Sequence, residues 1–277
     1  MNLIVSALAA MVAVTAAGIA AAQDAAAPQS FAFEGGTLTI AESDEGDKVL
    51  AFDGKELARN FVLYYDKNVE VGGKQIALFD GGDGGNQCGT NTIIVWKPDN
   101  GAVQSAIAGD DCGSPAAAIT EQSIYFVPFL LPGASKPAQI WTPTDGLKVA
   151  GTLAFTPQPG TDWKDLDPAK LYNVVDAFDN EAVYALGKQM LGDGITDFAM
   201  GLLVGGGTEK TPSGVFYASG CVPHACGGAD AFMGIDPHAR KLYFAQQGDQ
   251  EPRVTTWPAL TDWPADLKEA MQSAIGE

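Results

Sequence analysis

Basic residues and histidine are scarce in this sequence. Of its 277 residues, 16 are Lys or Arg and two are His, against 34 Asp or Glu, so the formal charge at neutral pH is -18. A chain this acidic repels polyanions, which argues against nucleic acid and anionic membranes as partners and favours a basic protein partner. An acidic surface that serves only solubility is the alternative interpretation.

Familiar catalytic motifs are also absent. The sequence holds no G-x-S-x-G elbow, no H-E-x-x-H pair, no P-loop and no dinucleotide fingerprint. The two histidines are His224 and His238, and His238 follows Asp236-Pro237, where a solvent-exposed turn is expected. We therefore expect a protein that is not an enzyme and that uses neither a cofactor nor a metal.

Long hydrophobic runs are limited to the N-terminus. Residues 1–22 form an apolar, Ala-rich run without a charged side chain, and the run closes on small residues. This pattern is typical of a cleavable signal peptide, followed here by a linker over 23–30. No second span, twin-arginine pair or Cys directly after the run occurs. We therefore expect a soluble, periplasmic or secreted protein without a lipid anchor or membrane contact after cleavage.

Residues 31–160 lack any extended helical period. Short β-prone runs alternate there with turn signals, which predicts an all-β domain of unknown role, built as an antiparallel meander or sandwich. The predicted turn pairs are Asp53-Gly54, Asp80-Gly81, Asn100-Gly101 and Asp145-Gly146.

Residues 161–277 mix helical and strand patterns, after a boundary near Gly160 that is rich in Pro, Gly and Asp. Apolar residues recur at helical spacing over 171–178 and over 183–191, and both stretches are predicted to be amphipathic helices. Strands are predicted for GVFYASG, DAFMGI and KLYFAQQ. The second half is therefore expected to be an α+β domain, with an antiparallel sheet and flanking helices.

The C-terminal end, TDWPADLKEAMQSAIGE, predicts one more amphipathic helix. Asp262 is the expected N-cap, and Leu267, Ala270, Met271, Ala274 and Ile275 fall on one face. Trp257 and Trp263 are predicted to pack beneath this helix, and stacking of the two rings on sugars is the alternative.

Cysteine is rare, with four in the chain. In an exported protein four cysteines indicate two disulfides, and the sequence alone permits three pairings. Proximity along the chain favours Cys88–Cys112 and Cys221–Cys226. Loop closure is worth about 3.5 kcal/mol for the larger ring and about 2.2 kcal/mol for the smaller one, so the smaller bridge mainly fixes local shape.

The smaller ring lies in SGCVPHACGG and encloses His224. Pro223 restricts the backbone beside this histidine. A redox dithiol is one alternative, although the spacing is not C-x-x-C. Zinc held by Cys221, Cys226 and His224 is another, although oxidation after export competes for the thiols. The third alternative is a turn closed by a disulfide, in which the exposed histidine has no function.

Acidic residues gather beside the larger ring. Asp80, Asp83, Asp110 and Asp111 could supply oxygen ligands to Ca²⁺. They match neither a complete EF-hand nor a nonapeptide repeat, so turns are the preferred interpretation.

The segment CVPHAC resembles the C-K-P-H-D-C loop of the Ivy family, the inhibitors of vertebrate, c-type lysozyme. Its surroundings agree with that family: a helix-rich lead-in, a strand that ends at Cys221, a Gly after Cys226, and then two further strands. The likeness covers about the last 100 residues and leaves the first half without a named family.

The resemblance implies a periplasmic, commonly dimeric protein that projects this loop into the cleft of c-type lysozyme. His224 would meet the two catalytic carboxyl groups, while Pro223 and the Cys221–Cys226 bridge hold it in position. Val222 and Ala225 stand where the family has Lys and Asp, so the polar contacts of those side chains are gone. The resemblance thus predicts inhibition of c-type lysozyme or of another peptidoglycan-cleaving enzyme, such as a lytic transglycosylase. The alternative is a non-catalytic envelope binding or scaffold protein whose function lies in residues 31–160.

Overall fold

A computed structural model describes residues 27–85, 88–110, 112–248 and 253–276 of the chain. The predicted signal peptide at 1–22 lies outside these ranges, and so does Asp111. Within them, no helix is both long enough and apolar enough to cross a bilayer.

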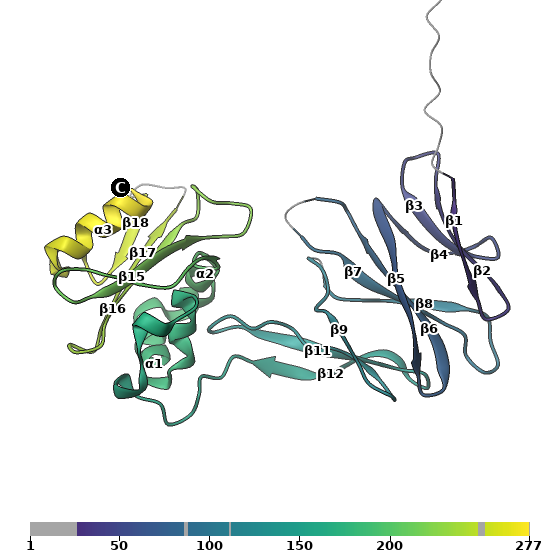
Figure 1. Cartoon of the computed structure of the whole chain (residues 1–277), viewed down its shortest axis with the longest axis horizontal. Helices are drawn as coiled ribbons and strands as arrows, with labels where there is room; N and C mark the ends of the chain where they lie inside the picture. Colours follow the sequence, from purple (N-terminus) through teal and green to yellow (C-terminus); the bar gives the residue numbers. More distant parts are fainter. Residues whose placement is uncertain (1–26, 86–87, 111, 249–252, 277) are drawn as a thin grey trace, which may run out of the picture.

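The first half of the chain forms three antiparallel sheets of four strands each (Figure 1). In every sheet neighbours along the chain pair with each other, so the predicted antiparallel meander is confirmed. The first sheet contains β1 (Gln29–Phe33), β2 (Gly36–Glu42), β3 (Lys48–Phe52) and β4 (Lys55–Asn60). The second contains β5 (Val62–Val71), β6 (Lys74–Gly82), β7 (Asn91–Trp96) and β8 (Gln104–Ala108). The third contains β9 (Ala117–Ile119), β10 (Ile124–Phe126), β11 (Ser135–Thr142) and β12 (Gly146–Ala154).

The second sheet lies between the other two and is buried on both faces. Along β6, Ala77 and Phe79 pack with side chains of the first sheet, while Ile76 and Leu78 pack with those of the third. In β7, Ile93 and Val95 face the first sheet, while Ile94 and Trp96 face the third. A strand buried on both sides needs apolar side chains at successive positions, which explains the unbroken runs IALF and TIIVW.

Three of the four predicted turn pairs lie at turns that connect strands. At Asp53-Gly54 both residues have positive φ, as the tight turn between β3 and β4 requires. Asn100-Gly101 lies in the connection from β7 to β8, and Asp145-Gly146 lies where the turn after β11 enters β12, with Gly146 as the first residue of that strand. The prediction for Asp80-Gly81 is wrong, because both residues lie inside β6. A Cβ on Gly81 would come within 2.8 Å of an Ile93 methyl carbon, so close packing explains this glycine.

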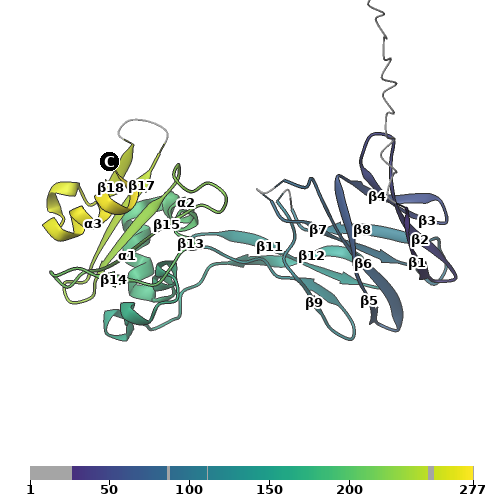
Figure 2. The same ribbon diagram turned by 45° about the horizontal axis from the view of Figure 1, so that its top comes forward.

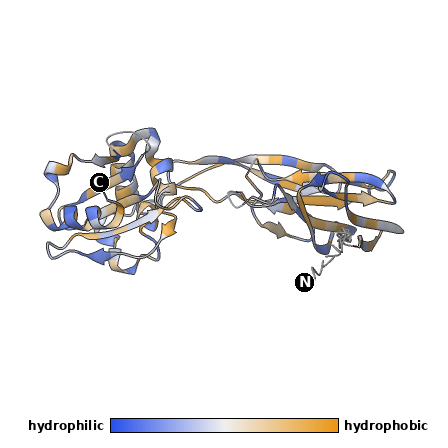
Figure 3. Cartoon of the chain, turned by 90° about the horizontal axis from the view of Figure 1, so that it is seen from above, coloured by the Kyte–Doolittle hydropathy of each residue, from blue (hydrophilic) through white to orange (hydrophobic). Residues whose placement is uncertain are grey.

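The second half is built on a six-stranded antiparallel sheet (Figure 2). Its order is β13 (Val204–Gly205), β15 (Phe216–Cys221), β16 (Ala231–Asp236), β17 (Lys241–Gln247) and β18 (Val254–Trp257), with β14 (Glu209–Lys210) also paired to β15. One face packs against α1 (Glu181–Leu191) and α2 (Ile195–Met200), and the other against α3 (Ala265–Ile275). The predicted α+β class is therefore confirmed, with helices on both faces. Figure 3 shows hydrophobic residues along the strands of both halves.

Of the two predicted helical stripes, only 183–191 lies in a regular α-helix, α1. The stretch 171–178 was predicted wrongly, because 3₁₀ turns at Pro168–Lys170 and Val174–Asp179 replace the expected helix. The side chain of Asn173 accepts a hydrogen bond from Val175 N at 3.0 Å and starts a new turn in the middle of the stretch. The side chain of Asn180 then caps α1, so only a short segment remains between the two caps.

The N-cap predicted for the last helix is also wrong. α3 begins at Ala265 after Pro264, which forms no side-chain cap, while Asp262 belongs to the 3₁₀ turn Leu260–Asp262. Trp263 is buried beneath α3 beside Leu267, so its predicted packing is confirmed. Trp257 packs instead against the core on the opposite face of the sheet.

The two halves share part of their core. The loop between β10 and β11 enters the second half, where Leu131 is 6% exposed within the cluster formed by α1, α2 and the sheet. Phe155, directly after β12, packs against the same cluster. β11 and β12 thus run as a two-stranded ribbon from the β-rich half into the second core (Figures 1 and 2).

Candidate inhibitory loop

The CVPHAC segment leaves the end of β15 and belongs to the connection toward β16. Cys221 is the last residue of β15 and is buried in the sheet, whereas Cys226 is exposed. A disulfide joins the two, with their Cα atoms 4.9 Å apart. The ring is therefore fixed to the sheet at one end and extends into solvent at the other.

Within the ring, residues 222–225 form a tight β-turn. Ala225 N donates a hydrogen bond to Val222 O at 3.0 Å, and Pro223 and His224 occupy the two central positions. His224 has φ of +64°, which a type II turn requires at its second central position, and proline favours the first. This conformation disfavours most side chains other than glycine and asparagine.

The turn leaves His224 open to solvent. The residue is exposed, and its side chain forms no hydrogen bond or ion pair with any part of the chain that the structure describes. The turn restricts the backbone, and the side chain has no internal contact that must be broken before it binds another molecule. Both ring nitrogens are therefore available to a partner.

A second set of hydrogen bonds supports the ring from behind. The carboxylate Oδ1 of Asp230 accepts from Gly227 N at 2.7 Å, directly after Cys226. Asp230 in turn exchanges hydrogen bonds with Gln247 of β17, whose side-chain amide also donates to the carbonyl of Ile275 at the end of α3. Sequence reasoning missed Asp230, although an Asp shortly after a Gly-Gly pair is a common turn signal.

The base of the ring also contacts the segment after α2. Val204 of β13 pairs with Cys221, and Gly205 pairs with Gly220. A Cβ on Gly220 would lie 2.7 Å from the carbonyl oxygen of Leu202, so only glycine permits this close approach of the two backbones. The position of the ring is thus tied to α2 as well as to the sheet.

The other disulfide, Cys88–Cys112, is also present, with Cα atoms 4.6 Å apart. All four sulfur atoms are thereby paired, which leaves no thiolate for zinc or for thiol exchange. Asp83 accepts a hydrogen bond from Gly85 N, and Asp110 accepts one from Cys112 N, as in turns closed by aspartate side chains.

Asp80 lies inside β6, apart from these turns. Burial raises the pKa of its carboxyl group, and the charge of Asp66 adds to the effect. Across the described ranges, no three His, Cys, Asp or Glu side chains gather in a way that could hold a metal ion.

Comparison with known proteins matches two separate parts of the chain. Residues 34–154 match the family model Y4bG N-terminal domain, and residues 182–277 match the model Inhibitor of vertebrate lysozyme (Ivy). The chain is also similar to a protein of Sinorhizobium fredii (strain NBRC 101917 / NGR234) called "Uncharacterized protein y4bG". The two are 26% identical over 239 residues, which cover 86% of this chain and 87% of that protein.

Proposed function

We propose, from the premise that residues 182–277 form an Ivy domain, that this chain is an extracytoplasmic inhibitor of a peptidoglycan-cleaving muramidase. The observation that carries the proposal is the exposed His224, held at positive φ in a turn that a disulfide closes. The disulfides and the Ivy domain favour an oxidising compartment outside the cytoplasm, and we place the protein in the periplasm or among secreted proteins.

The chemistry of a muramidase site suits such a group. A lysozyme-type cleft pairs a protonated carboxyl group with an ionised one on either side of the scissile bond. An imidazole inserted between them can donate a hydrogen bond from one ring nitrogen to the ionised carboxylate and accept one at the other nitrogen from the protonated carboxyl group, and hydrogen bonds to an ionised acceptor are the strong ones. The ring of His224 would occupy the place of the substrate and offer no bond to cleave, so the chain acts without catalysis of its own.

The preformed turn lowers the cost of this insertion. Ordering a flexible side chain at an interface costs about 0.5–1.5 kcal/mol, and the bridge, Pro223 and Asp230 restrain the turn before binding. The formal charge of -18 would attract a basic enzyme and speed the encounter, an effect that salt weakens.

The flanks of His224 influence which enzyme is the target. Val222 and Ala225 are apolar and form no side-chain hydrogen bonds beside the histidine. Val222 and Ala225 would therefore face the rim of the target cleft with small apolar side chains. They would offer no hydrogen bonds to an enzyme whose rim is polar, and inhibition of such an enzyme would be weaker. A c-type lysozyme is the first target we propose, and a lytic transglycosylase is the second.

The test is the lysis of peptidoglycan-bearing cells by c-type lysozyme in the presence of the full exported chain. We expect the rate to fall as the protein approaches a 1:1 ratio, and to recover when His224→Ala replaces the wild type. His238→Ala is the matched control, because His238 is exposed in the turn between β16 and β17. An unchanged lysis rate at excess protein would exclude c-type lysozyme, and the same assay with a lytic transglycosylase then decides the second target.

A further inference from the structure

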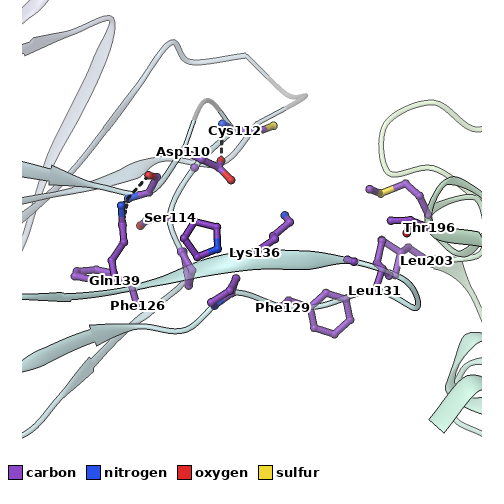
Figure 4. Close-up of a pocket in the computed structure, with 17 residues that line it drawn as sticks. Asp110, Cys112, Ser114, Phe126, Phe129, Leu131, Lys136, Gln139, Thr196 and Leu203 are labelled. Atoms are coloured by element: carbon purple, nitrogen blue, oxygen red, sulfur yellow. Dashed lines mark hydrogen bonds between the residues drawn. The ribbon is translucent and has the colours of Figure 1, made fainter. Parts of the chain in front are cut away.

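A groove of about 460 Å³ lies where the β-rich half meets α2 (Figure 4). One wall comes from the segment that carries Cys112, the floor comes from β11 and the loop before it, and the other wall comes from α2 and the residues after it. The apolar side chains that line it include Phe126, Phe129, Leu131, Met200 and Leu203.

Two of these apolar side chains are unusually open to solvent. Phe129 is 72% exposed and Met200 is 37% exposed, although both line a concave surface. Asp110 and Lys136 supply charged groups at the same groove. The groove thus combines apolar side chains, among them an aromatic ring and a methionine, with a few charged groups, and this is the composition of a protein–protein contact surface. A glycan site would need more hydrogen-bonding groups in its centre.

The groove is continuous with the base of the inhibitory loop. Leu203 lines the groove, and the next residue, Val204, pairs directly with Cys221. Directly paired residues of antiparallel strands have Cα atoms about 4.5–5.5 Å apart. Figures 1 and 2 both show the β15–β16 connection bending toward the β-rich half.

The loop alone is too small to make a stable complex. Specific protein–protein interfaces take about 20–30 residues from each partner, or about 800 Å² per side. The ring contains six residues, and Cys221 is buried within the chain. Most of the contact area must therefore come from surfaces beside the loop, and the groove is apolar, exposed and adjacent.

We propose that this groove is a second contact surface for the muramidase that receives His224, and that it takes an apolar side chain from the rim of the enzyme's cleft. This inference rests on the proposed function. It assigns a role to the N-terminal half, since Phe129 belongs to the β10–β11 loop on the floor of the groove and Cys112 to the wall opposite α2. The enzyme would then contact both halves of the inhibitor at once.

The affinity of the full chain for c-type lysozyme tests the inference, with inhibition and titration calorimetry as the two readouts. Phe129→Ala and Met200→Ala should each weaken binding, and we expect a loss of about 30-fold for Phe129, as for an interface hot spot. Phe61→Ala is the matched control, because Phe61 is 61% exposed and does not line the groove. It should bind as the wild type does.

Each outcome has a separate meaning. If His224→Ala abolishes binding while Phe129→Ala and Met200→Ala leave it unchanged, the groove is no part of the interface and this inference is overturned. If the wild type itself does not bind, the proposed function fails first. If the two groove variants change only the oligomeric state of the free chain, measured by sedimentation, the occupant is a second copy of the chain and the inference is again overturned.

Discussion

Thr196 Oγ1 donates a hydrogen bond to the carbonyl oxygen of Pro132 at 2.9 Å. This bond joins α2 of the second half to the loop between β10 and β11 of the first, beside the buried Leu131. Because residues on both sides of Gly160 build one core, an isolated C-terminal piece would lack part of its own packing. The domain boundary predicted near Gly160 stays a prediction, and the experiments above use the full chain for this reason.

Gly133 should be the most sensitive position at this junction. It has φ of +81°, and a Cβ there would lie 2.5 Å from Ile195 Cγ2 and 2.9 Å from Thr196 Oγ1. Gly133→Ala should therefore lower the free energy of unfolding by about 1–3 kcal/mol, from overpacking and from the strained backbone together. Gly160→Ala is the control, because Gly160 has φ of +77° with nothing within 4 Å of a Cβ. Equal destabilisation of both variants in urea would show that α2 does not restrict the turn.

Substitutions of His224 separate the role of its side chain from that of its backbone. His224→Gly should fold at least as stably as the wild type, because glycine adopts φ of +64° without strain, yet it should lose inhibition. His224→Val should both lose inhibition and strain the turn, since a β-branched residue at positive φ is strongly disfavoured. Inhibition constants and thermal midpoints measure the two effects. A glycine variant that still inhibits would show that the backbone of the loop, and not the imidazole, blocks the enzyme.

Removal of the smaller disulfide should affect inhibition more than folding. The double substitution Cys221→Ala with Cys226→Ala opens a six-residue ring, which costs about 2.2 kcal/mol by loop-closure entropy. The six-stranded sheet should persist, while the ordering cost of the loop is added to binding and raises the inhibition constant. Circular dichroism and the lysis assay report the two properties. The matching substitution at Cys88 and Cys112 opens the larger ring, should cost about 3.5 kcal/mol, and should leave the shape of the inhibitory loop unchanged.

Asp266 should make stability depend on pH. Its carboxylate accepts hydrogen bonds from Ser213 N, Ser213 Oγ and Leu267 N, and the bond from the Ser213 backbone is the main reason that its pKa is lowered from the ordinary value of 3.8. A lowered folded-state pKa contributes stability above the unfolded value, and this stability is lost as pH falls through the folded value.

Asp266→Asn should therefore lower the thermal midpoint at pH 7, and the difference from the wild type should shrink as pH falls below 3.8. Asp262→Asn is the control, because among the described residues the Asp262 carboxylate accepts a side-chain hydrogen bond from its neighbour Thr261 alone, and it caps no helix there. A difference that stays constant between pH 7 and pH 3 would contradict this role for the carboxylate of Asp266.

Local patterns determined much of the fold. Turn signals such as Asp53-Gly54 and β-prone runs predicted an antiparallel meander, because hairpin turns and strand propensity are properties of neighbouring residues. The apolar spacing over 183–191 predicted α1 for the same reason. The prediction of a helix over 171–178 was wrong, because the side chains of Asn173 and Asn180 accept hydrogen bonds from nearby backbone N–H groups and start new turns there.

The candidate loop was visible in the sequence because its chemistry is local. Two cysteines, a proline and a histidine lie within six residues, and the Cys221–Cys226 bridge is the pairing that proximity along the chain favoured. The role of His224 as an inhibitory group stays a prediction. The support of the loop by Asp230 was missed, because a turn signal at Asp230 does not reveal its hydrogen-bond partner Gln247, which lies on another strand.

By itself the sequence determined the acidic charge, the strand and turn pattern, the α+β character of the second half and the chemistry of the disulfide-closed loop. Only the tertiary structure decided that the second sheet is buried on both faces, that Leu131 belongs to the core of the other half, and that an apolar groove adjoins the loop. These features depend on contacts between residues far apart in the chain. Propensity and spacing describe only near neighbours, so they cannot specify which distant surfaces meet.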